Sequence, residues 1–184
     1  MSSNSDREIY SSRIINASLE IAYQAFANPI HLQKWWGPEG FTNTIHEFDL
    51  QPEGKWILTM HGPEKGNYEN SSIFKTVEPH KLITWTRISQ PIFDMEVGFE
   101  NISNSKTRIS FRMIFNSVEE CEKIKRFAMP KNEENFDRLE RALPNIILPA
   151  PLGPMMASIS AGWTMIERLL SALNPSNDTE TPSR

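Results

Sequence analysis

The strongest constraint on the fold is a pair of consecutive segments in which apolar and polar residues alternate strictly. In the first segment every other residue is apolar: Phe93, Met95, Val97 and Phe99. The second segment, residues 107–115, alternates in the same way. Because successive side chains of a strand point to opposite faces, both segments predict antiparallel strands with one buried and one solvated face. The stretch between them is rich in Asn and Ser, which predicts a hairpin.

Further strand-like segments precede this pair, and turns containing Pro or Gly separate most of them. They are residues 8–16, 44–50, 55–61, 67–77 and 82–87. Two short helices are expected between the first and second of these strands. Ser18 is suited to cap the first helix, and Pro29 is suited to begin the second.

The apolar period changes from two to 3.6 after residue 116. Ser117 and Glu120 form a capping-box signature, and an apolar stripe follows on one helical face: Cys121, Ile124, Phe127 and Ala128. Pro130 predicts a kink or break, after which residues 133–143 continue the helix. On its solvated face, Glu134/Arg138 and Asp137/Arg141 have the spacing of helical ion pairs. The order of elements predicts an α+β fold, a curved antiparallel sheet of six to seven strands around a long C-terminal helix.

The length of 184 residues exceeds what one such domain requires. We expect a domain at 1–143, a linker with four prolines at 144–154, an additional amphipathic helix at 155–173 and a polar tail at 174–184. The apolar stripe of the additional helix has to be covered. It either docks on its own domain or buries against a second copy, in which case the chain forms a homodimer through 155–173.

Composition narrows the classes of function. The net charge of −4 gives no support for a nucleic-acid or anionic-membrane partner. The N-terminal residues lack the apolar stretch of a signal peptide, and no apolar run is long enough to span a membrane. The single cysteine excludes an internal disulfide and suits a reducing, cytoplasmic location. No metal-ligand spacing, Gly-rich phosphate loop or nucleophile elbow is present, so we expect no metal, no cofactor and no catalytic constellation.

Residues 35–41, with the sequence WWGPEGF, resemble the opening motif of a known family. They are similar to proteins related to the C-terminal domain of the activator of the heat-shock protein 90 ATPase, within the START-like (SRPBCC, birch-allergen-like) superfamily. Other matches follow in the family's order, at 49–56, 79–82, 99–108 and 132–140. The resemblance covers residues 9–143 and implies a helix-grip fold with an apolar cavity between the sheet and the C-terminal helix.

Two features depart from the family pattern. Glu53 stands where the family has the first glycine of a Gly-Gly turn, so the turn geometry is expected to differ. Residues 162–169 also resemble the helix that closes the family's domain. Two segments therefore compete for the same groove.

The residues expected to line the cavity are mostly aromatic residues and methionines, which suit an apolar ligand. They are Trp36, Phe41, Trp56, Met60, Phe74, Trp85, Phe93, Met95, Met113 and Phe127, with His46 and Tyr68 as polar members. Each of them is alternatively a plain core residue. His46 is expected on the inward face beside Thr59 or Tyr68, either as a polar handle or general base or simply hydrogen-bonded in place.

Three functions follow from these observations. The first is non-catalytic binding of a hydrophobic small molecule, apolar or aromatic, in the cavity. The second is a role as a co-chaperone that activates the heat-shock protein 90 ATPase, by analogy with the family's namesake. The third is a START-like cyclase or hydrolase, which needs convergent polar groups such as His46 and Tyr68 inside the cavity.

Overall fold

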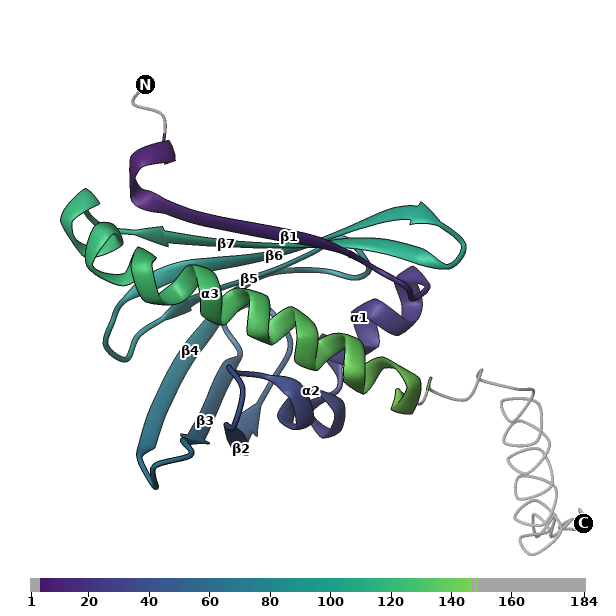
Figure 1. Cartoon of the computed structure of the whole chain (residues 1–184), viewed down its shortest axis with the longest axis horizontal. Helices are drawn as coiled ribbons and strands as arrows, with labels where there is room; N and C mark the ends of the chain where they lie inside the picture. The colour runs from purple at the N-terminus through teal and green to yellow at the C-terminus, as the bar shows by residue number, and fades with distance from the viewer. Residues whose placement is uncertain (1–3, 147, 149–184) are drawn as a thin grey trace, which may run out of the picture. The chain divides into compact units, whose positions relative to one another are not determined.

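A computed structural model describes residues 4–146 and 148 of the chain. Seven antiparallel strands form one sheet in the order β1-β7-β6-β5-β4-β3-β2 (Figure 1). The strands are β1 (Glu8–Ile15), β2 (Thr42–Phe48), β3 (Lys55–His61), β4 (Asn67–Glu78), β5 (Leu82–Arg87), β6 (Phe93–Ser103) and β7 (Lys106–Phe115). A short 3-10 helix, Asn4–Arg7, precedes β1. The alternating pair that dominates the sequence forms β6 and β7, as predicted.

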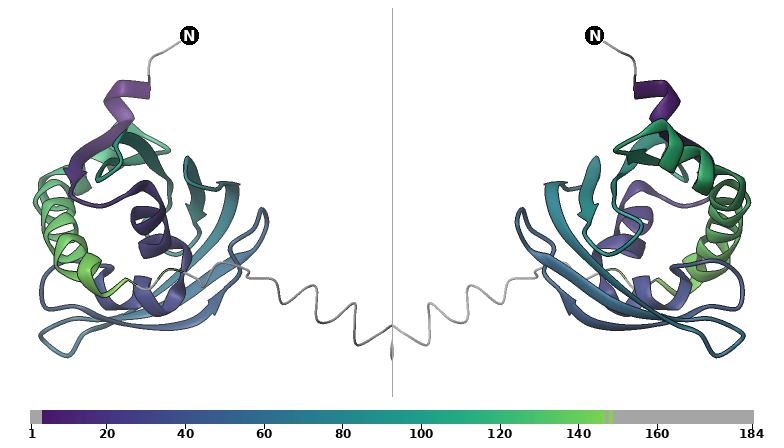
Figure 2. Two further views of the ribbon diagram at one scale, coloured as in Figure 1. Left: turned by 90° about the vertical axis from the view of Figure 1, so that its right-hand side faces the viewer. Right: turned by 90° about the vertical axis from the view of Figure 1, so that its left-hand side faces the viewer.

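Three α-helices lie on the concave side of the sheet, which curves around them (Figure 2). They are α1 (Leu19–Ala27), α2 (Pro29–Trp35) and the long α3 (Val118–Ala142), which continues into a 3-10 turn at Leu143–Asn145. The predicted caps are confirmed. Ser18 Oγ accepts the Ile21 N–H at 3.3 Å, and Ser117 Oγ accepts the Glu120 N–H at 3.2 Å. Together the sheet and helices confirm the α+β helix-grip fold.

The long helix α3 runs without interruption through Pro130, so the predicted break is absent. Proline removes one backbone hydrogen bond, the one that would reach the carbonyl of Arg126. Both residues are exposed, so water can satisfy the freed carbonyl. A continuous helix is therefore compatible with this proline.

The side of α3 that was expected to be a solvated face instead makes long-range contacts. Arg13 of β1 donates to Glu133 at 2.6 Å, to Asp137 at 2.5 Å and to Glu140 at 3.2 Å. Burial works to lower the pKa of Arg13, but hydrogen bonds to Asp137 and Glu133 raise it overall. The predicted pairs within the helix are wrong, because their members bind partners outside it or at other spacings.

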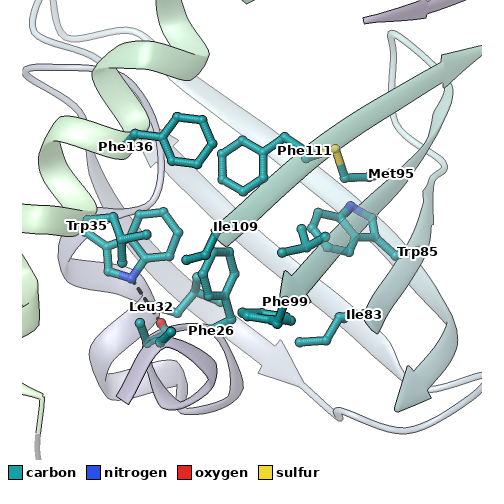
Figure 3. Close-up of a cluster of buried hydrophobic side chains, with 14 of the residues drawn as sticks. Phe26, Leu32, Trp35, Ile83, Trp85, Met95, Phe99, Ile109, Phe111 and Phe136 are labelled. Atoms are coloured by element: carbon teal, nitrogen blue, oxygen red, sulfur yellow. Dashed lines mark hydrogen bonds between the residues drawn. The ribbon is translucent and has the colours of Figure 1, made fainter. Parts of the chain in front are cut away.

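The concave face is tightly packed where α1 and α2 cover it (Figure 3). Phe111 stacks on Phe136 with a centroid distance of 4.5 Å, and Phe26 meets Phe99 edge-on at 5.1 Å. The indole N–H of Trp35 donates to the Ala25 carbonyl at 3.0 Å. A void of only about 10 Å³ remains nearby, lined by Phe26, Leu32, Phe48, Leu50, Trp56, Phe74, Ile83 and Trp85.

Part of the predicted organisation cannot be compared with the structure. The helix expected at 155–173, the tail at 174–184 and most of the linker at 144–154 (residues 147 and 149–154) lie outside the described residues. The homodimer through 155–173 therefore stays a prediction. Within residues 4–146 and 148, no helix is long and apolar enough to cross a membrane. The same residues contain no cluster of three or more His, Cys, Asp or Glu side chains that could hold a metal ion.

Candidate functional site

A cavity of about 240 Å³ lies between α3 and the concave face of β3 to β7. Its walls come from the loop after α2, from five strands and from α3. The lining residues are Trp36, Gly37, Pro38, Trp56, Leu58, Met60, Asn70, Ser72, Trp85, Arg87, Phe93, Met95, Met113, Ala128, Lys131, Asn132 and Asn135. Ligand pockets in proteins typically begin at about 300 Å³. The size of this one therefore suits a small ligand.

Three indole rings form the largest apolar wall. Trp36 lies 5.2 Å from Trp56 and 5.9 Å from Trp85 between ring centroids, and Trp56 lies 5.2 Å from Trp85. The rings are tilted or edge-to-face, as the quadrupoles of aromatic rings favour. Three flexible methionines, Met60, Met95 and Met113, complete the wall and can adapt to the shape of a ligand.

The adjacent residues Trp35 and Trp36 take different environments because the helix ends between them. Trp35 is the last residue of α2 and is buried in the core, whereas Trp36 is the extended C-cap and lines the cavity. Gly37 follows with φ of +96°, a conformation that other residues rarely adopt. A Cβ at this position would lie 2.5 Å from Cε of Met60. The Trp-Trp-Gly-Pro sequence is thus the one that turns Trp36 inward.

Arg138 of α3 binds several backbone carbonyls of this loop. Arg138 donates to the carbonyls of Gly37 at 2.8 Å and of Pro38 and Phe41 at 2.7 Å, with longer bonds to Lys34 and Trp36. Burial lowers the pKa of Arg138. Sequence reasoning missed this role, because the carbonyl acceptors belong to the backbone and carry no residue-type signal.

A second residue of α3 supports the same loop. The Glu134 carboxylate accepts the backbone N–H of Glu39 at 3.0 Å and the ammonium group of Lys131 at 2.8 Å. These two hydrogen bonds, first the one from Lys131, lower the pKa of Glu134. Arg141 pairs with the side chain of Glu39. The loop that carries Trp36 is therefore bound to α3 by Arg138, Glu134 and Arg141.

Polar side chains gather in one part of the cavity, and none of them was predicted. They are Asn70 and Ser72 of β4, Arg87 of β5, and Lys131, Asn132 and Asn135 of α3. Asn132 donates to Ser11 Oγ at 3.3 Å. Oδ1 of Asn135 and Nε1 of Trp56 are buried, with no hydrogen-bond partner in the described part of the chain. These two groups are candidates for contacts with a polar group of a ligand.

Arg87 is the most distinctive of these polar residues. Its Nε donates to Ser89 Oγ at 3.1 Å, its Nη2 donates to the Gln90 carbonyl at 2.9 Å, and its guanidinium group lies 5.7 Å from the Phe93 ring centroid. Burial lowers its pKa. A charge in this position is costly unless it is paired.

Seven of the twelve residues predicted to line the cavity do so. They are Trp36, Trp56, Met60, Trp85, Phe93, Met95 and Met113. Phe74 belongs to the closed core, where it stacks on Trp56 at 6.1 Å. Phe41 and Tyr68 contact each other at 5.9 Å outside the lining, and Tyr68 is 54% exposed.

Two further predicted positions, those of Phe127 and His46, are also wrong. The side chain of Phe127 is 72% exposed, because the inward face of α3 takes the neighbouring Ala128 instead. His46 is exposed rather than inward, although the predicted neighbour is correct: its Nε2 lies 2.8 Å from Thr59 Oγ1 and is hydrogen-bonded to it. A β-bulge between Ile45 and Glu47 adds one residue to β2 and reverses the alternation that placed His46 inside.

The chemistry available in the cavity follows from its lining. Among its described residues there is no Asp, Glu, His or Cys, and the one lysine, Lys131, is paired with Glu134. The single cysteine, Cys121, is buried in the core and outside the lining, and burial raises the pKa of its thiol. The arrangement can enclose and orient a small molecule by apolar contacts and hydrogen bonds.

Comparison with solved structures places this fold among known ones. An X-ray structure of a protein from Nitrosomonas europaea matches with a TM-score of 0.71 and 18% identity, over 79% of this chain and 99% of that one. A solution NMR structure from Arthrobacter aurescens gives 0.71 and 19%, over 82% and 91%. The AHSA1 protein of Silicibacter pomeroyi gives 0.62 and 16%, over 74% and 97%. At these identities the likeness shows the fold.

Comparison at the level of sequence gives the family. A search of curated proteins found no match. The family model described as "Activator of Hsp90 ATPase homolog 1-like protein" matches residues 16–144, which comprise the three α-helices, all the strands after β1 and the loop with Trp36. The chain therefore belongs to the Activator of Hsp90 ATPase homolog 1-like family, whose fold is START-like.

Proposed function

We propose that the protein binds a small apolar or aromatic molecule without catalysis, in the cavity between the sheet and α3. The observation that carries this proposal is the cavity of about 240 Å³ with its wall of three tryptophans and three methionines. Tryptophan faces and edges favour aromatic ligands, and each well-oriented pair of rings contributes about 0.5–1.5 kcal/mol beyond area burial. A pocket that is mostly apolar with a few polar groups is typical of small-molecule sites.

The other two functions receive less support from the chain's own residues. A cyclase or hydrolase needs convergent acid–base groups, and His46 and Tyr68 lie outside the cavity. Activation of a chaperone ATPase, which the family description names, acts on a protein partner. The feature that these residues build is a partly closed cavity between the sheet and α3, which instead suits a small molecule.

The methionines give a direct test of binding. Full-length protein labelled at the methionine methyl groups is titrated with 2-acetylnaphthalene, a small neutral aromatic probe, and followed by NMR. We expect the Met60, Met95 and Met113 signals to shift, because their side chains line the cavity. The signal of Met129, an exposed residue of α3, should stay in place and serves as the internal control.

A pair of variants locates the binding. Ala128 lines the cavity from α3, so Ala128→Phe should occupy the space and abolish the methyl shifts. Arg126→Phe adds a ring at an exposed position of the same helix and should leave them unchanged. Circular dichroism verifies that both variants are folded. If the three methyl signals do not move in the unmodified protein, or move equally in Ala128→Phe, the proposal is refuted.

A further inference from the structure

Resting on the proposed function, we propose that the ligand carries an anionic group, a carboxylate in the simplest case, and that Arg87 binds this group inside the cavity. The ligand class is then a small aromatic acid. Its rings would lie against the tryptophans and its carboxylate would lie at the part of the cavity formed by β4 and β5. This assignment goes beyond apolar binding, because it predicts that the cavity prefers anionic ligands to neutral ligands of the same shape.

The first argument is that Arg87 lacks the carboxylate partner that four other arginines have. Arg13, Arg108, Arg112 and Arg141 each have a carboxylate within 4 Å. Arg87 has no such carboxylate in the described part of the chain, and its Nη1 makes no hydrogen bond there. An unpaired charge in a partly closed apolar site is costly, so an anion that pairs with it is stabilising.

The second argument is the alignment of donors across three adjacent strands. In the sheet register Trp56 of β3 lies opposite Ser72 of β4, and Ser72 lies opposite Arg87 of β5. Residues opposite each other in antiparallel strands have Cβ atoms about 5 Å apart and share a face. Nε1 of Trp56 is buried and has no hydrogen-bond partner among the described residues. The row therefore offers a guanidinium, a hydroxyl and an indole N–H.

The third argument is the local sign of charge. The chain as a whole has a net charge of −4, whereas the lining of the cavity contains two cations, Arg87 and Lys131, and no carboxylate. Lys131 is paired with Glu134 at 2.8 Å, so its charge is offset. Arg87 remains as the uncompensated charge. Its burial lowers its pKa, and a bound anion opposes that shift.

The geometry of a guanidinium adds selectivity. Its planar fork suits a carboxylate, which can accept two parallel N–H bonds, whereas a neutral amide of the same shape presents one acceptor. An amide would also place two N–H donors next to a cation. The preference between an acid and its amide thus reports on Arg87 separately from the apolar contacts.

Isothermal titration calorimetry of the full-length protein with 2-naphthoate and 2-naphthamide tests this inference. These probes share rings and shape and differ in charge. We expect 2-naphthoate to bind at least about tenfold more tightly than 2-naphthamide, because hydrogen bonds between charged groups contribute more to affinity than neutral ones. Arg87→Gln should remove the preference by weakening 2-naphthoate alone, and Arg87→Lys should retain part of it. Arg108→Gln, the same change on the opposite face of the sheet, should retain the full preference.

The outcomes separate this inference from the proposed function. Equal affinity of both probes for the unmodified protein would overturn the role of charge and leave apolar binding established. A preference for the acid that survives in Arg87→Gln would overturn the assignment to Arg87. If neither probe binds, the proposed function itself fails and this inference with it. Circular dichroism of both Arg87 variants verifies the fold, and Arg87→Lys gives a second measurement if Arg87→Gln is unstable.

Discussion

The two ends of the concave face have the same aromatic character but opposite packing. At the end covered by α1 and α2, Phe111 stacks on Phe136 (Figure 3), and rings such as Phe26, Phe48 and Phe74 line a void of only about 10 Å³. At the other end, Trp36, Trp85 and their neighbours enclose about 240 Å³. Aromatic residues by themselves therefore do not distinguish a closed core from a cavity.

The difference lies in the residues between the rings. On the inward face of β4, Phe74 is followed towards the open end by Ser72 and Asn70. β5 changes in the same way from Ile83 through Trp85 to Arg87. Packing these polar side chains tightly against apolar rings would cost free energy, so this end does not close in the same way. The cavity is built by polar substitutions at inward strand positions.

The largest expected effect tests this contrast by removing one side chain from each end. Phe136 is fully buried at the closed end, so Phe136→Ala should lower the free energy of unfolding by about 3–5 kcal/mol. Met113 is partly buried and borders the cavity, so Met113→Ala should cost less than about 2 kcal/mol. Urea denaturation measures both. Equal losses would mean that the open end is packed as tightly as the closed one.

The elements that could be predicted from the sequence are those whose signals are local. Alternation in β6 and β7 and the caps of α1 and α3 depend on residues a few positions apart, so they are visible in the chain itself. The errors occurred where a single residue shifts the pattern of inward and outward side chains. The bulge after Ile45 turns His46 outward. On α3, Phe127 and Ala128 both lie one turn after Ile124, and Ala128 is more buried than Phe127.

The polar part of the cavity was not predictable for a different reason. Ser72 and Arg87 are ordinary surface residue types, and they become inward only through the register between β4 and β5. The hold of Arg138 on the loop of Trp36 likewise depends on carbonyl groups that are distant in sequence. The sequence indicated the aromatic wall because residue type marks it. It could not indicate groups whose role is set by tertiary position.

The second largest effect concerns the loop that belongs to the open end. Arg138→Met keeps much of the side-chain volume but leaves several carbonyls without their donor, so it should cost about 1.5–3 kcal/mol. Because Trp36 is carried by this loop, tryptophan fluorescence should also shift. Arg126→Met, at an exposed position of α3, is the matched control and should change neither property. No loss in Arg138→Met would show that the loop is held by its own turn.

A smaller effect is expected in the turn between β2 and β3, at the closed end. Glu53 has φ of +66°, the left-handed conformation that its glycine counterpart in the family would adopt without strain. Glu53→Gly should therefore stabilise the protein by about 0.5–1 kcal/mol. Gly54→Ala should destabilise it, because the added Cβ meets the carbonyl of Asp49. Thermal unfolding measures both, and probe affinity in the cavity should be unchanged in Glu53→Gly.

The smallest effect is a local response to acid that should occur at the open end alone. Hydrogen bonds from Lys131 and from the Glu39 N–H lower the pKa of Glu134 below its ordinary value of 4.5. A lowered pKa means that the contact contributes its full stability above the pKa of the unfolded chain. That contribution is lost as the pH falls through the lower pKa of the folded state.

An NMR titration from neutral pH to about pH 3 follows this loss. The amide signal of Glu39 should move with the protonation of Glu134, whereas that of Phe111 in the closed core should not. In Glu134→Gln the Glu39 amide signal should depend less on pH, because the glutamine side chain does not change its charge. If the Glu39 amide signal depends on pH in the same way in that variant, another group controls the loop. Since the loop carries Trp36, this result would also decide whether acid loosens the wall of the cavity through α3.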